Sequence, residues 1–329
     1  MSAGLISVRN LTKDYGDNRG VFDISLDIQE GEVFGYLGTN GSGKTTTIRH
    51  MMGFLKPDSG EVLVNGLNPW KQAPEVMKDV SYIPGEIAFP DLPTGTDFFK
   101  VQAQFLGVKD FTYMNHLIDL LGLDPSASLK RMSKGMKQKT AIVAALMGDK
   151  RILIMDEPTT GLDPLMRETF LELVREEKKK GRTIFMSSHI FEEIEDVCDR
   201  VAIIGNGKIK DVLSLYKLRH DTPRMFRITF ASEAAAQEYA QRIKEMPPRC
   251  ASAAGCADHL ENASRRVGAP DAVVDENEKA KVSFAVPAAE TDRMIKATKG
   301  LPVISVDETH EDLEEYFMKI VRNSSKSIT

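Results

Sequence analysis

The chain has 329 residues, of which 42% are apolar and 28% charged, and its formal net charge is -5. These values are ordinary for a soluble globular protein of about one or two domains and give no electrostatic argument for nucleic acid as a partner. The apolar runs are too short to cross a bilayer, the first residues lack the apolar core of a signal peptide, and three cysteines make no disulfide framework. We therefore expect a cytoplasmic protein that needs another chain if it acts at a membrane.

The first segment predicts an antiparallel hairpin and then a buried strand. Leu5–Tyr15 and Val21–Ile28 alternate apolar and polar residues on either side of the turn GDNRG, and Glu32–Leu37 has the composition of a buried strand. Tyr15 ends the first of these strands. Its position alone favours packing in the core over stacking against a base.

The next residues fit the phosphate-binding P-loop pattern G-x-x-x-x-G-K-[ST] between a predicted strand and a predicted helix. Small residues let successive backbone N–H groups turn inward around an anion, and the helix directs its positive dipole end at the same anion. Lys44 adds a charge near the β- and γ-phosphates, and the Thr45 hydroxyl can ligate Mg²⁺. A plain glycine turn is the alternative. The residues expected to bind the nucleotide are consecutive: Gly38, Thr39, Asn40, Gly41, Ser42, Gly43, Lys44, Thr45 and Thr46.

The middle of the chain predicts a helical lobe, about residues 86–148, inserted between two strands of a sheet. Glu61–Gly66 and Val80–Pro84 have the composition of short strands before it. Ser133 can cap the last helix of the lobe, which runs through an alanine-rich stretch. The earlier helices are expected where apolar residues recur at helical spacing: Thr96–Leu106 and Phe111–Leu121.

The strand after the lobe ends in two carboxylates. Ile152–Met155 is continuously apolar, as a central parallel strand should be, and Asp156 and Glu157 follow at its carboxyl end, where open α/β sheets bind ligands. Downstream of a P-loop, Asp156 is expected to hold Mg²⁺ and Glu157 to orient or deprotonate water. A helix from Pro164 to about Lys180 then leads to a buried strand that ends at His189. Because that strand emerges beside the carboxylates, a functional histidine is favoured.

After a hairpin at Val201–Lys210, the composition changes near residue 216, with a polar joint, LRHDTPR. We expect two domains, residues 1–217 and a small accessory α/β domain, residues 218–329. Residues 247–279 predict a long loop rich in alanine and charge. Its Cys250, Cys256 and His259 lack the further ligand that would complete a zinc site. The strands expected in the second domain contain RMFRITF, KVSFAV and LPVISV, and the helices lie near Ser232–Glu245, Ala288–Thr298 and Asp312–Val321.

Met132–Gln138, MSKGMKQ, lies shortly before the two carboxylates and resembles the signature sequence LSGGQ of ATP-binding-cassette (ABC) proteins. With this element, Leu5–Tyr216 resembles the nucleotide-binding subunit of bacterial ABC exporters whose ATPase and membrane parts are separate chains. The resemblance implies an α/β P-loop NTPase (ABC ATPase) core with an antiparallel β subdomain and a helical lobe, followed here by the small C-terminal α/β domain. Lys134 and Met136 depart from the signature, replacing its first glycine and its glutamine.

The resemblance also implies roles for single residues. It makes Tyr15 the aromatic that stacks on adenine, against the interpretation from position alone. Ser133 and Gly135 match the signature, which in the family reaches the γ-phosphate bound to the opposite subunit. Asp163 matches the aspartate of the D-loop, and His189 the switch histidine that senses the γ-phosphate.

One position departs from the family in a way that affects the metal. The family has a glutamine in the loop after the strand VSYIP, where it links Mg²⁺ to the membrane interface, and this chain has Gly85. Glu86, the next residue, is a candidate metal ligand in its place. Water alone is the alternative.

The resemblance implies an ATP- and Mg²⁺-dependent ATPase that dimerises on ATP and drives a polytopic membrane permease from the cytoplasmic side of the membrane. The second ATPase subunit is expected to be a copy of this chain, with a heterodimer open, and the cargo a drug, peptide or lipid-like substrate for export. The alternative is a soluble ABC-type ATPase outside a transporter. Translation-type members carry two cassettes and repair-type members a long coiled coil, and the sequence has one cassette and no sustained heptads. The signature and switch histidine argue against an unrelated P-loop kinase or GTPase.

Overall fold

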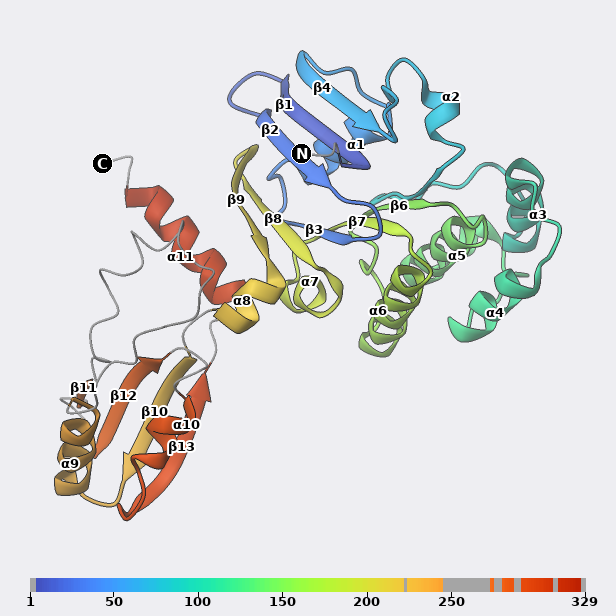
Figure 1. The fold of residues 1–329 in the computed structure, drawn as a ribbon. Coiled ribbons are helices and arrows are strands. Elements are labelled where there is room, and N and C mark those ends of the chain that lie inside the picture. The colour runs from blue at the N-terminus through green and yellow to red at the C-terminus, as the bar shows by residue number, and fades with distance from the viewer. Residues whose placement is uncertain are drawn as a thin grey trace. The chain divides into compact units, whose positions relative to one another are not determined.

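The computed structural model describes residues 4–221, 224–244, 273–274, 280–286, 291–309 and 313–326. The chain forms two compact units, Met1–Leu215 and Tyr216–Thr329 (Figure 1). Within the described residues, no helix is long and apolar enough to cross a membrane.

A six-stranded sheet forms the centre of the first unit, in the order β5-β6-β7-β3-β8-β9. The first five strands of this order run parallel, and β9 returns antiparallel to β8. Every residue of the central strands β3 and β6 is buried, as the continuous apolar runs predict. The strands are β3 (Val33–Leu37), β5 (Val80–Ile83), β6 (Ile152–Asp156), β7 (Thr183–Ser188), β8 (Arg200–Gly205) and β9 (Lys208–Ser214).

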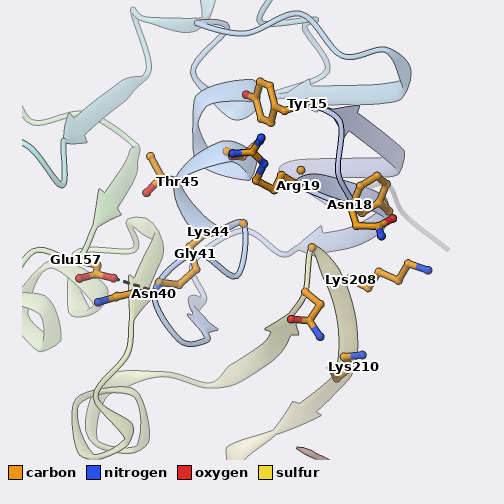
Figure 2. Close-up of a pocket in the computed structure, with 16 residues that line it drawn as sticks. Tyr15, Asn18, Arg19, Asn40, Gly41, Lys44, Thr45, Glu157, Lys208 and Lys210 are labelled. Carbon is orange, nitrogen blue, oxygen red and sulfur yellow. Dashed lines mark ion pairs between the residues drawn. The ribbon is translucent and has the colours of Figure 1, made fainter. Parts of the chain in front are cut away.

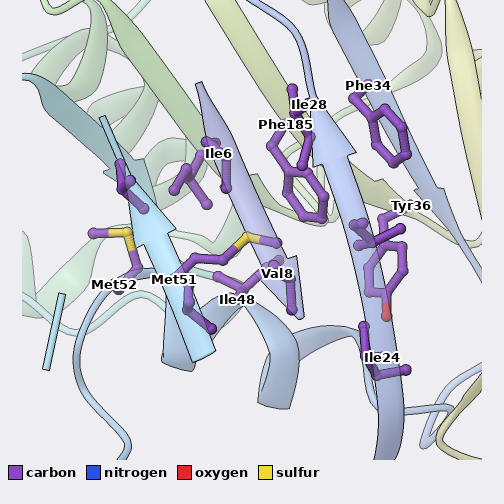
Figure 3. Packing of buried hydrophobic residues seen from close by; sticks show 14 of the residues in the cluster. Ile6, Val8, Ile24, Ile28, Phe34, Tyr36, Ile48, Met51, Met52 and Phe185 are labelled. Atoms are coloured by element: carbon purple, nitrogen blue, oxygen red, sulfur yellow. The ribbon is translucent and has the colours of Figure 1, made fainter. Parts of the chain in front are cut away.

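A second, antiparallel sheet has the order β2-β1-β4 and confirms the predicted hairpin. It consists of β1 (Ile6–Asp14), β2 (Gly20–Ile28) and β4 (Ser59–Val64). Helix α1 (Lys44–Met51) contacts strands of both sheets. Figure 3 shows side chains of the two sheets and of α1 packed in one core, among them Ile6, Val8, Ile28, Phe34, Phe185, Ile48 and Met51. Each such side chain contributes about 1.5–3 kcal/mol on burial, so this core holds α1 against both sheets.

Helices α3 (Gly95–Leu106), α4 (Thr112–Leu120) and α5 (Lys134–Leu146) form the predicted helical lobe, with the 3₁₀ turn η1 (Leu129–Arg131). Ser133 caps α5 as expected, because its hydroxyl accepts a hydrogen bond from the Met136 N–H at 3.2 Å. Short helix α2 (Ala73–Val76) precedes the lobe, and α6 (Pro164–Lys179) and α7 (Phe191–Val197) follow it. Neither α2 nor α7 was predicted from the sequence.

The second unit contains a four-stranded antiparallel sheet in the order β11-β12-β10-β13. With α9 after β10 and α10 after β12, the described elements follow the β-α-β-β-α-β order of ferredoxin-like domains. Phe226, Ile228 and Phe230 of β10 pack with Tyr239 and Ile243 of α9 in its core. The elements are α8 (Leu215–Asp221), β10 (Arg224–Phe230), α9 (Glu233–Lys244), β11 (Val273–Val274), β12 (Lys281–Val286), α10 (Thr291–Lys296), β13 (Val303–Thr309) and α11 (Leu313–Lys326).

Two details of this part of the chain were not predicted. The polar joint begins as helix α8, because Leu215 and Leu218 give it a buried side. Of the predicted loop 247–279, the structure describes Val273–Val274 alone, and these two residues form strand β11, which pairs with β12. Cys250, Cys256 and His259 lie outside the described residues.

Candidate active site

The loop between β3 and α1 has a backbone that requires glycine at several positions. Gly41 and Gly43 have φ angles of 78° and 111°, in the left-handed region. At Gly38, a Cβ atom would lie 2.5 Å from the carbonyl oxygen of Ile204. Side chains at these positions would strain or fill the loop. Its small residues therefore keep a concave backbone open beside the start of α1, which is the shape that an anion requires.

Lys44 is held inside this loop. Its side chain is buried, and its ammonium group donates hydrogen bonds to the carbonyl oxygens of Gly38 at 2.6 Å and Thr39 at 3.1 Å. The same nitrogen lies 3.1 Å from a carboxylate oxygen of Glu157. The loop thus fixes a positive charge at the point where the P-loop and the end of β6 meet.

Asp156 is buried at the end of β6 with both carboxylate oxygens bonded. The hydroxyl of Thr45 donates to Oδ2 at 2.7 Å, and that of Ser187 donates to Oδ1 at 2.6 Å. Ser187 was not predicted from the sequence. Its place follows from the parallel register of β6 and β7, which pairs Asp156 with Ser187. A hydroxyl and a carboxylate at this distance form a hard-oxygen donor set that suits Mg²⁺.

Glu157 lies between two potential proton or charge partners. Its backbone has φ 48°, an uncommon conformation for this residue, and its N–H donates to the Ser187 hydroxyl at 3.0 Å. One carboxylate oxygen contacts Lys44, and the other lies 3.1 Å from Nδ1 of His189. The structure therefore brings Glu157 and His189 together at the ends of adjacent strands.

These groups border an open cavity of about 880 Å³ (Figure 2). Tyr15, 51% exposed, presents its side chain at one side of the cavity, and the P-loop forms another. Of the residues expected to bind the nucleotide or act on it, Tyr15, Asn40, Gly41, Gly43, Lys44, Thr45, Thr46 and Glu157 line this space. The remaining lining residues were not found by the sequence analysis: Asn18, Arg19, Gly20, Phe22, Asn206, Gly207, Lys208 and Lys210.

Ser133, Gly135 and Asp163 do not line this cavity in the described chain. A Cβ at Gly135 would lie 2.9 Å from the carbonyl oxygen of Gly161. The buried amide of Gln138 donates to the Pro158 carbonyl at 2.6 Å. The signature segment therefore packs closely against the loop that follows Glu157 and is hydrogen-bonded to it. Asp163 ends that loop and caps α6 by accepting from a backbone N–H.

Glu193 of α7 is a buried carboxylate that contacts two segments near His189: the residues after Glu157 and the end of β7. It is buried and accepts hydrogen bonds from the hydroxyls of Thr159 at 3.0 Å and Ser188 at 2.9 Å, and it pairs with Arg167 at 3.2 Å. Burial raises the pKa of Glu193, and the two hydroxyl donors oppose that rise. This carboxylate links the segment after Glu157 to the end of β7.

Gly85 adjoins the candidate metal site, and Glu86 lies in a second cavity. A Cβ at Gly85 would lie 3.2 Å from Oδ2 of Asp156, so this loop borders the buried carboxylate. Glu86 is exposed and lines a cavity of about 320 Å³ with Lys134, Lys137 and Gln138 of the signature helix. No contact between Glu86 and Asp156 or Thr45 is present among the described side chains.

Comparisons with known proteins agree on one family. A family model described as ABC transporter matches residues 21–160, within the first unit. The chain is 34% identical over 218 residues to the bacitracin transport ATP-binding protein BcrA of Bacillus licheniformis, across 65% of this chain and 71% of that protein. It is 35% identical over 210 residues to the linearmycin resistance ATP-binding protein LnrL of Bacillus subtilis, across 62% and 68%. A solved structure of the ATP-binding subunit of an ABC transporter aligns with a TM-score of 0.59 and 31% identity, covering 65% of this chain and 91% of that one.

Proposed function

The chain belongs to the ATP-binding proteins of ABC transporters and is an ATPase of that family, and we propose that its ATP-driven dimerisation moves a separate membrane permease. The observation that carries the proposal is the meeting of the P-loop lysine, Thr45, Asp156 and Glu157 at one edge of the parallel sheet.

The nucleotide lies with its base on Tyr15 and its phosphates in the P-loop. A half-exposed ring at the edge of the cavity offers a stacking face, which suits adenine without fixing the base. Gly41 and Gly43 allow backbone N–H groups to approach the phosphates, and Lys44 supplies a full charge.

Thr45 and Asp156 are the residues that would hold Mg²⁺, and their 2.7 Å contact places a hydroxyl and a carboxylate oxygen together for it. When bound, Mg²⁺ neutralises charge on the β- and γ-phosphates. Ser187 keeps the Asp156 carboxylate in one orientation by donating to its other oxygen.

Glu157 accepts a proton from the attacking water, and His189 orients the Glu157 carboxylate that it contacts. The 3.1 Å distance between Nδ1 of His189 and the Glu157 carboxylate supports this pairing. The His189 side chain is about half exposed, so it is also accessible to a γ-phosphate bound beside Glu157.

A second ATPase subunit completes each site. Ser133 and Gly135 lie outside the cavity that their own P-loop borders, so their contribution to hydrolysis requires a different chain. The loop from Glu157 to Asp163 contacts this signature. In the dimer, it therefore connects the catalytic carboxylate of one site with the signature that serves the other site. A homodimer of this chain is the simplest assembly.

The proposal for cargo and direction is supported by two relatives, whose names refer to bacitracin transport and linearmycin resistance. Export of a drug, peptide or lipid-like molecule, from the cytoplasmic side of the membrane, is the corresponding function here. Co-purification tests the partner: the full chain expressed with its neighbouring genes should bring down a polytopic membrane protein. A chain that purifies alone from detergent-solubilised membranes, with full ATPase activity, would favour a soluble ABC-type ATPase.

Lys44→Ala tests the nucleotide site directly. The variant should lose ATP affinity in titration calorimetry, because the charge directed at the phosphates is gone. An affinity equal to that of the wild-type chain would refute the assignment of the P-loop.

A further inference from the structure

The turn between β1 and β2 contributes three side chains to the cavity, Tyr15, Asn18 and Arg19, of which Tyr15 and Arg19 are paired. The N–H of Tyr15 donates to the Arg19 carbonyl at 2.8 Å, next to the paired residues Asp14 and Gly20. Tyr15 and Arg19 are therefore cross-strand neighbours, and such neighbours project to one face. Both residues line the cavity, and Figure 2 shows the Arg19 side chain between Tyr15 and the Lys44 and Thr45 side of the pocket.

The charge of Arg19 is available to a ligand. Its ion pair is with Asp17 at 3.2 Å, and the two side chains are 74% and 87% exposed, so the pair contributes little. Glu157 is the one carboxylate in the described lining of the cavity, and it already contacts Lys44. No acidic side chain within the cavity lining neutralises Arg19.

On the basis of the proposed function, we propose that Arg19 binds the α-phosphate of the nucleotide. A nucleotide stacked on Tyr15 with its β- and γ-phosphates at Lys44 must pass its ribose and α-phosphate between them. Arg19 lies on that path, and a guanidinium group can bind two phosphate oxygens at once.

This position has a defined consequence for selectivity. The α-phosphate is common to ATP, ADP and GTP, so Arg19 strengthens the binding of all three by the same factor. Lys44, at the β- and γ-phosphates, discriminates among nucleotides by phosphate number. Arg19 therefore retains the product ADP as well as the substrate.

The test is titration of the full chain, with Mg²⁺, against ATP, ADP and GTP. Arg19→Ala should weaken all three affinities by a common factor of about three to ten, as expected of an exposed charge-assisted contact. Arg19→Lys should lose less affinity than Arg19→Ala, because lysine keeps the positive charge. It should still lose some, because lysine lacks the paired N–H donors of the guanidinium group. Arg9→Ala is the matched control: Arg9 lies in β1 of the same hairpin and, like Arg19, pairs with an aspartate, Asp27, but it does not line the cavity.

Unequal losses would overturn the proposal. A loss for ATP without a loss for ADP would place Arg19 at the γ-phosphate, and different losses for ATP and GTP would place it at the base. Unchanged affinities, or an equal loss in Arg9→Ala, would remove any specific role. A wild-type chain that binds none of the three nucleotides would refute the proposed function itself. Because Arg19 is exposed, an unchanged unfolding midpoint should accompany its variants.

Discussion

The ammonium group of Lys44 and the carboxylate of Glu157 lie 3.1 Å apart, although Lys44 begins helix α1 and Glu157 follows strand β6. The side chains are only 4% and 22% exposed, so water screens this pair less than it screens a surface pair. A γ-phosphate must therefore compete with Glu157 for Lys44. The same carboxylate that is proposed to activate water also restrains the cation that binds phosphate.

Glu157→Gln should consequently separate binding from hydrolysis. The amide cannot accept the proton of water, so turnover should fall by about 10²–10⁴-fold. ATP affinity should rise, because Lys44 loses its anionic partner, and an ATP-bound dimer should accumulate in size-exclusion chromatography. Glu192→Gln, which removes a charge at the start of α7 outside the described cavity lining, is the control. Turnover at the wild-type rate would refute the role of Glu157.

The location of the signature predicts complementation between two inactive chains. Lys44→Ala disables the P-loop, and Ser133→Arg replaces the small cap of α5 with a bulky cation. Each homodimer should be inactive. A mixed dimer contains one site in which an intact P-loop faces an intact signature, so mixing should restore part of the ATPase activity.

A steady-state ATPase assay checks this expectation after subunit exchange has been verified with labelled chains. Mixing Lys44→Ala with Glu157→Gln is the control, because neither of its two possible sites has both an intact P-loop and an intact Glu157. No recovery in the first mixture, with exchange demonstrated, would contradict independent sites assembled from two subunits.

Local patterns in the sequence predicted the P-loop, the carboxylates and the strands that precede them, because each depends on residues close in the chain. Ser187 and Arg19 escaped prediction for a different reason. Ser187 reaches Asp156 through the register of β6 and β7, and Arg19 reaches the cavity through the pairing of β1 with β2. Strand β11, two residues long, has too few positions for an alternating pattern to show.

The buried pair Arg182 and Glu177 predicts a large effect on stability. The two side chains are 5% and 1% exposed and lie 2.7 Å apart, and the Tyr113 hydroxyl of α4 also donates to Glu177. Arg182→Met should destabilise the first unit by about 3 kcal/mol, because Glu177 stays buried with less compensation. Lys180→Met, at a 42% exposed side chain that also contacts Glu177, should cost less. Urea unfolding followed by circular dichroism measures both, and equal losses would show that burial of Arg182 adds nothing.

The glycine beside Asp156 leads to a prediction about Mg²⁺. A Cβ at Gly85 would stand 3.2 Å from Oδ2 of Asp156, so the position faces the donor set but brings no ligand of its own. Glu86 is the nearest acid in this loop, and it lines the neighbouring cavity with Lys134 and Lys137. To reach the metal, directly or through a bound water, the Glu86 side chain must turn from this cavity toward Asp156.

We expect Glu86→Ala to raise the Mg²⁺ concentration needed for half-maximal ATPase activity, and Gly85→Gln to restore part of that loss in the double variant. The added glutamine supplies an amide oxygen next to Asp156, where the glycine supplies none. Asp91→Ala, which removes an exposed acid from the same segment, is the control and should leave the Mg²⁺ dependence unchanged. The measurement is a Mg²⁺ titration at fixed ATP, with dimer formation followed in parallel. An unchanged Mg²⁺ requirement in Glu86→Ala, at unchanged dimer formation, would mean that water alone completes the metal site.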